Sequence, residues 1–75
     1  MSDYVTDPRP FAECLKDFAL RLNNGNNYGS RPLAEAELCV PRATLAKWLN
    51  GGACDREASM RKLMTLILRA RSRNP

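Results

Sequence analysis

The sequence predicts a compact all-α domain of four helices, or five. Three observations point to this fold class. Apolar residues recur at intervals of three and four along much of the chain, which is the period of an amphipathic helix. Residues that break or cap helices, chiefly asparagine, glycine and proline, separate the periodic segments. No stretch alternates polar and apolar residues as a half-buried strand would.

The first helix is expected over residues 8–23, after a flexible arm formed by residues 1–7. Asp7 can cap the helix N-terminus, although Pro10 would delay the start. One face of this helix is apolar and is predicted to enter the core; it carries Phe11, Leu15, Phe18 and Leu22. Leu20 lies on the opposite face, where it is either exposed or in contact with a partner.

The second and third helices are short and are separated by clear signals. The run over residues 23–29 is rich in Asn and Gly, which tolerate left-handed backbone and end helices. Ser30 is then expected to cap a helix of about two turns, with an inward face formed by Leu33, Ala34 and Leu38. Pro41 fits the first turn of a third helix of about ten residues, which Gly51-Gly52 would close. Its core side is predicted to carry Leu45, Trp48 and Leu49.

The fourth helix is expected to begin at an Asp55 cap and to end at about residue 71, before a basic tail over residues 72–75. Its apolar stripe comprises Met60, Leu63, Met64 and Ile67. Leu66 and Leu68 lie beyond the two edges of that stripe. Two readings therefore remain open: one leucine is partly exposed, or the helix forms a homodimer contact.

The composition argues against catalysis. The chain has 75 residues, which is one domain with little core to enclose a substrate. It contains no histidine, the side chain that most often transfers protons near neutral pH. No nucleophile paired with a base, no spaced carboxylate pair and no glycine-rich phosphate loop is present. We therefore expect a protein that is not an enzyme and that uses no cofactor.

The cysteines and the apolar runs indicate a soluble protein in a reducing compartment. Cys14, Cys39 and Cys54 form no CxxC pair, so neither a metal site nor a disulfide framework is expected. Each is predicted to be a small, mostly buried hydrophobe. The apolar runs are far too short to span a membrane, and the N-terminus lacks an apolar export region. We expect a cytoplasmic protein with no membrane partner.

The charge is unevenly distributed along the chain. The net charge of +4 divides into −2 over residues 1–40, with four basic and six acidic residues, and +6 over residues 41–75, with eight basic and two acidic residues. A protein that meets a polyanion with one side has this polarity, because a cationic surface releases counterions from phosphates. A solvated helix face with a basic tail would have it too.

The outward side of the third helix suits the major groove of DNA. A helix enters that groove where its exposed side is slim and carries donors for base edges and phosphates. Ala43 and Ala46 make this side slim, while Arg42 could pair with guanine. Asn50 could read adenine or hold a phosphate, and Thr44 and Lys47 suit backbone contacts. The same side chains would also suit an ordinary solvent-exposed face.

The pattern over residues 30–51 has Leu33-Ala34 in its first helix, Val40 after the turn, and Thr44-Leu45 with the run Trp48-Leu49-Asn50-Gly51 in its second helix. It resembles the helix-turn-helix of Cro and lambda-repressor-like transcriptional regulators, and the flanking helices extend the resemblance loosely over residues 8–68. In that family the second motif helix is the recognition helix. The resemblance therefore implies that bases are read by Arg42, Ala43, Ala46 and Lys47.

This sequence departs from the family pattern at the turn. Cys39 stands where the family commonly has glycine, and one more residue separates Leu33-Ala34 from that position. We expect an extra residue in the first motif helix or its turn. The pattern of the recognition helix is unaffected.

These observations predict sequence-specific binding of double-stranded DNA by a small transcriptional regulator of the phage type, with the recognition helix over residues 41–50. The domain would cover residues 8–71. Candidate contacts to the DNA backbone are Arg31, Thr44, Asn50, Arg61, Lys62, Arg69, Arg71 and Arg73. A homodimer through the fourth helix would match two-fold related half-sites.

Two other functions remain as alternatives. A protein-interaction module could keep this helical fold and use Leu20 or Leu66 to bind a larger regulator or enzyme. RNA binding is less favoured because stacking aromatics are scarce, with Tyr4 and Tyr28 as the plausible exposed ones.

Overall fold

The computed structural model describes residues 3–72 of the chain. This part contains four helices, joined by turns and loops, and no strand. In chain order they are α1 (Phe11–Leu22), α2 (Ser30–Leu38), α3 (Arg42–Leu49) and α4 (Glu57–Ser72). The prediction of an all-α four-helix domain is confirmed.

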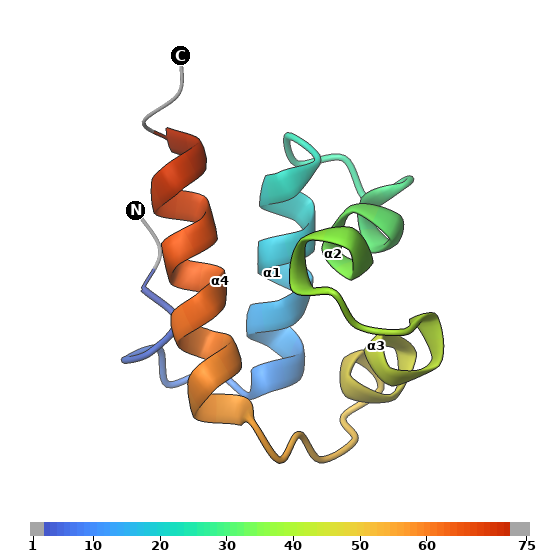
Figure 1. Ribbon diagram of the computed structural model, residues 1–75, viewed down its shortest axis with the longest axis vertical. Coiled ribbons are helices and arrows are strands. Elements are labelled where there is room, and N and C mark those ends of the chain that lie inside the picture. The colour runs from blue at the N-terminus through green and yellow to red at the C-terminus, as the bar shows by residue number, and fades with distance from the viewer. Residues whose placement is uncertain (1–2, 73–75) are drawn as a thin grey trace.

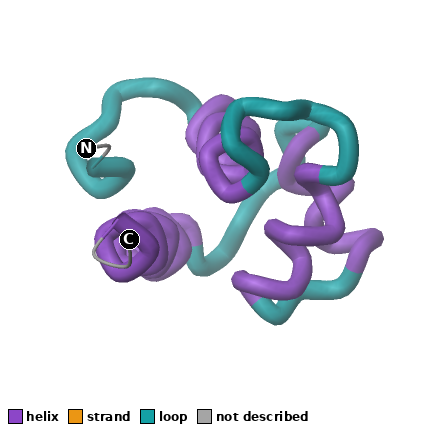
Figure 2. The backbone as a smooth tube through the Cα atoms, turned by 90° about the horizontal axis from the view of Figure 1, so that it is seen from above, coloured by secondary structure: helices purple, strands orange, loops and turns teal. Residues whose placement is uncertain are grey.

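Helix α1 organises the packing. It contacts each of the other three helices, and α4 also contacts α2, whereas α3 and α4 do not meet. In Figure 1, α4 therefore stands on one side of α1, while α2 and α3 occupy the other. Figure 2 gives the same arrangement from above.

The helices begin within three residues of the predicted positions. Helix α1 starts at Phe11 rather than residue 8, because Pro10 disfavours helical backbone at the preceding residue. Pro10 itself has extended backbone, with ψ 151°. Asp7 is not a helix cap; its carboxylate accepts a hydrogen bond from the backbone N–H of Arg9 at 2.9 Å.

The starts of the other three helices also differ slightly from the predictions. Gly29, with φ +81°, precedes α2, and the Ser30 hydroxyl donates to the carbonyl of Asn27 instead of capping the helix. Pro41 precedes α3 in extended backbone. Helix α4 starts two residues after Asp55, because the N–H of Glu57 bonds to the carbonyl of Cys54 and closes a turn there.

The core lies between α1 and the apolar sides of the other helices. All four residues predicted for the inner face of α1 are buried, as are Leu45, Trp48 and Leu49 of α3. The rings of Phe11 and Trp48 meet edge to face at 5.7 Å between centroids, which joins α1 to α3.

Several burial predictions were wrong. Leu33 is 40% exposed, so the inner side of α2 consists of Ser30, Ala34 and Leu38. Cys39, directly after α2, is exposed, whereas Cys14 is buried and Cys54 packs against the core, as predicted. Leu33 and Cys39 are exposed because a two-turn helix on a small domain buries only a narrow strip of its surface.

Helix α4 presents leucines to solvent. Met60 and Met64 are buried and Ile67 is partly buried, as the stripe predicts. Leu63, the remaining member of that stripe, is 37% exposed, and Leu66 is 48% exposed. The narrow inner side of α4 packs against α1, so these two leucines remain exposed to solvent.

Tyr4 is buried, so its ring is not the exposed aromatic that the sequence predicts, and within the described residues the predicted flexible arm is anchored to the domain at this position. Its side chain has no exposed surface and its ring lies edge-on to Phe18, with the centroids 6.4 Å apart. Its backbone N–H donates to Thr65 Oγ1 at 3.0 Å and its hydroxyl donates to Asp17 at 2.7 Å. Burial acts to raise the pKa of Asp17, but the hydrogen bonds from Tyr4 and Arg21 outweigh it and leave that pKa below its usual value.

Arg61 holds the N-terminal segment against α4. Its side chain is 10% exposed, and its guanidinium donates to the carbonyls of Tyr4, Asp7 and Arg9 at 2.9, 3.2 and 2.8 Å. It also donates to Glu57 at 3.0 Å and to the Cys14 sulfur at 3.3 Å. Arg61 therefore has a structural role, and its nearly buried guanidinium is occupied by these partners rather than open to the phosphate that the sequence analysis assigned to it.

We predict that Arg61→Ala lowers the free energy of unfolding by about 3 kcal/mol, because three carbonyls lose their donor and the N-terminal segment loses its anchor. Urea unfolding measures the change. Lys62→Ala removes a neighbouring exposed charge as a control and should stay within about 0.5 kcal/mol of the parent. A loss below about 1 kcal/mol for Arg61→Ala would show that the anchor is dispensable.

Candidate nucleic-acid interface

The outward side of α3 is helical and open to solvent, as the sequence predicts. Arg42, Ala43 and Lys47 are exposed, and Asn50 is exposed directly after the last helical residue. Thr44 and Ala46 are half-buried at the borders of this side. We refer to Arg42, Ala43, Ala46, Lys47 and Asn50 together as the α3 face. It carries two cations and no acid.

The turn before α3 depends on a strained residue. Cys39 has φ +55° and ψ +43°, a left-handed conformation that glycine adopts most easily. Its backbone N–H and that of Val40 both bond to the carbonyl of Glu35, which ends α2. Val40 then packs against the core. The chain thus passes from α2 to α3 in three residues.

The end of α3 is closed by the two glycines that the sequence singled out. Gly51 has φ +89°, and its N–H bonds to the carbonyl of Trp48 at 3.1 Å. The N–H of Gly52 bonds to the carbonyl of Lys47 at 2.8 Å, which completes a Schellman motif. A Cβ on Gly52 would lie 2.7 Å from that carbonyl oxygen, so only glycine fits there.

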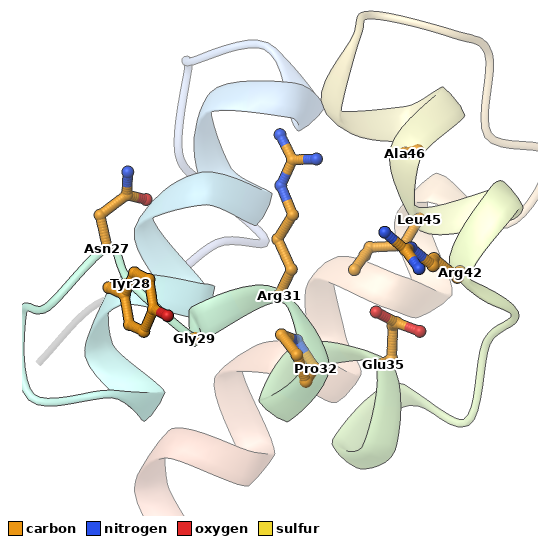
Figure 3. Close-up of a pocket in the computed structure, with 9 residues that line it drawn as sticks. All are labelled: Asn27, Tyr28, Gly29, Arg31, Pro32, Glu35, Arg42, Leu45 and Ala46. Carbon is orange, nitrogen blue, oxygen red and sulfur yellow. The ribbon is translucent and has the colours of Figure 1, made fainter.

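A shallow groove of about 750 Å³ lies between α3 and the start of α2 (Figure 3). It is lined by Asn27, Tyr28, Gly29, Arg31, Pro32, Glu35, Arg42, Leu45 and Ala46. The groove brings Arg31, a predicted backbone contact, to the same surface as Arg42. The α3 face therefore continues onto α2 and the preceding loop.

Six of the nine lining residues were not among the predicted site residues, and two of these, Tyr28 and Glu35, bear most on the chemistry of the groove. Tyr28 is 90% exposed, as the sequence analysis expects. Glu35 is the one acidic side chain among the nine, and in Figure 3 its carboxylate and the Arg42 guanidinium point toward one another. No local sequence pattern could have indicated that Glu35 and Arg42 line the same groove, because this depends on how α2 packs beside α3.

The remaining basic candidates lie elsewhere. Lys62 and Arg69 are exposed on α4, which does not contact α3. Arg71 forms an ion pair with Glu37 at 3.5 Å. Arg73 lies outside the described residues. Of the predicted backbone contacts, the structure brings Arg31, Thr44 and Asn50 to the surface around α3.

The described residues contain no cluster of three or more His, Cys, Asp or Glu side chains placed to hold a metal ion. Within residues 3–72, no helix has both the length and the apolar character to cross a bilayer. No family model matches the chain, and neither the curated proteins nor the solved structures include a significant match to it.

We predict that Cys39→Gly raises the free energy of unfolding by about 0.5 to 1 kcal/mol, because glycine relieves the left-handed strain at the turn and loses part of this gain to unfolded-chain entropy. Thermal and urea unfolding measure the change. Ala36→Gly, in the body of α2, should instead destabilise the protein by about 1 kcal/mol. Destabilisation by both changes would mean that the turn is not strained.

Proposed function

We propose that the protein binds double-stranded DNA in a sequence-specific manner, with α3 in the major groove, and acts as a small transcriptional regulator. The α3 face carries this proposal. No Asp or Glu occurs between Glu37 and Asp55, so the face presents Arg42 and Lys47 without a neighbouring acid on its own helix. A helix about 10–12 Å across matches a groove about 12 Å wide, provided that its outer side chains are small.

The residues of the α3 face divide into two roles. Arg42, in the first turn, can donate two hydrogen bonds to guanine, and the methyl groups of Ala43 and Ala46 can contact thymine. Lys47 reads bases or holds phosphates, while Thr44 and Asn50 contact the DNA backbone. The resemblance of residues 30–51 to the Cro and lambda-repressor-like motif supports this division.

The groove beside α3 adds a means of favouring base reading over general phosphate binding. Arg31 can hold a phosphate on the α2 side of the groove. A carboxylate at Glu35 would repel a phosphate from Arg42 and would leave this guanidinium to a base edge. A phage-type regulator that works in this way would act in the cytoplasm.

We predict that Arg42→Ala weakens binding to preferred sites by about 10- to 100-fold, because a bidentate guanine contact is worth about 1–3 kcal/mol, and weakens binding to random duplex much less. The preferred sites come from gel-shift selection on randomised duplex, followed by sequencing of the retained fraction.

Arg21→Ala is the matched control for that experiment. Arg21 is an exposed arginine on α1 that is ion-paired with Asp17, so its removal changes the net charge equally. It should leave site preference unchanged. If Arg42→Ala weakened all duplexes to the same extent, Arg42 would be a phosphate contact and the proposed base reading would be wrong.

We further predict that the logarithm of the binding constant falls with the logarithm of salt concentration with a slope of roughly −5, as expected for about 5 to 7 phosphate contacts. Fluorescence anisotropy on a labelled duplex measures this slope. Lys47→Ala should reduce its magnitude by about 1 if Lys47 holds a phosphate. Binding that does not depend on salt would rule out the proposed interface.

A further inference from the structure

The outward side of α4 is a second surface, separate from the α3 face. It is formed by exposed residues that recur at helical spacing: Ser59, Lys62, Leu63, Leu66, Arg69 and Ala70. We call this set the α4 outer face. Leu66 lies at its middle, opposite the buried side of the helix, and is 48% exposed; Leu63 is 37% exposed. Leu63 and Leu66 are adjacent on this side of the helix, and a contiguous exposed apolar patch with a polar rim marks an interaction surface.

The charges around Leu66 are of one sign. Lys62 lies one turn before Leu66 and Arg69 lies one turn after it. Neither cation forms an ion pair within residues 3–72. Between Glu57 and Arg71 the helix contains no acidic residue. The α4 outer face therefore combines an apolar centre with two uncompensated positive ends.

This arrangement disfavours a pair of identical α4 faces. In an antiparallel two-fold contact centred on Leu66, Lys62 of one copy lies within one residue of Arg69 of the other, at both ends of the contact. In a parallel contact, each cation faces its own counterpart. Like charges meet in both cases, which destabilises the dimer. A second copy of the chain, as in the predicted homodimer through the fourth helix, is thus a less favourable partner for this surface than a partner of opposite charge.

We propose that the α4 outer face binds an acidic amphipathic helix of another protein. The partner would place an apolar side chain on Leu66 and Leu63, and carboxylates one turn to either side, opposite Lys62 and Arg69. Because α4 does not contact α3, the chain can hold this partner and DNA at the same time. The inference does not depend on the DNA-binding proposal, since the two rest on different helices.

The test uses the full chain, labelled with ¹⁵N, and a synthetic amphipathic helical peptide with a leucine stripe flanked by glutamates. Backbone amide shifts should change along residues 58–71 and not along residues 42–50. A second peptide, with lysine in place of each glutamate, should bind at least about tenfold more weakly, because repulsion replaces attraction at both ends.

Matched variants locate the contact. Leu66→Ser should weaken binding of the acidic peptide at least about tenfold, which corresponds to the loss of a largely buried leucine side chain at the contact. Leu33→Ser makes the same change at a similarly exposed leucine on α2, 40% exposed, and should change affinity less than about twofold. Both variants alter solvent-exposed positions and should fold.

Three results would overturn the inference. They are no measurable binding of the acidic peptide, equal binding of the lysine peptide, and equal effects of the two leucine variants. Sedimentation gives a further check: a dimer at micromolar concentration that Leu66→Ser dissociates would assign the face to a second copy of the chain. None of these results bears on the effect of Arg42→Ala.

Discussion

The burial of one side of α3 against α1 is the constraint on which the proposed site depends. Helix α3 has eight residues, and an isolated helix of that length is not stable in water. It forms because Leu45, Trp48 and Leu49 are removed from solvent, with Trp48 set edge-on to Phe11. The same packing sets the rotation of the helix about its axis, so that the two cations of the α3 face point outward.

The two ends of α3 are held by backbone geometry rather than by side-chain caps. A left-handed Cys39 turns the chain out of α2, and a left-handed Gly51 followed by Gly52 ends α3. A surface that reads bases requires rigid placement of its side chains, since small displacements lose hydrogen-bond geometry. The hydrogen bonds at Gly51 and Gly52 and the three-residue turn fix where α3 ends and begins, at the expense of local strain at Cys39.

Arg61 and Tyr4 show how a domain of this size gains stability from contacts between its helices and the N-terminal segment. A chain of 75 residues buries a modest fraction of its surface, so contacts between distant segments matter. Arg61 binds three carbonyls of the N-terminal segment, and Tyr4 fills the space beside Phe18. With that segment packed on α4, the outer face of α4 and the α3 face are left as separate exposed surfaces of different chemistry.

Sequence periodicity alone determined the four helices, the inner face of α1 and the outward direction of Arg42, Ala43 and Lys47, because these features depend on neighbours within a few residues along one helix. Proline and glycine positions likewise determined where α1 and α3 begin, to within three residues, and where they end, to within one residue. Tertiary structure alone decided whether Tyr4, Arg61, Leu33 and Leu63 are buried or exposed. It also decided that Glu35 and Arg42 line the same groove. The burial of each of these side chains depends on which other segment of the chain packs over it. A local sequence pattern does not specify which part of a helix surface remains exposed when the helix packs on a small core.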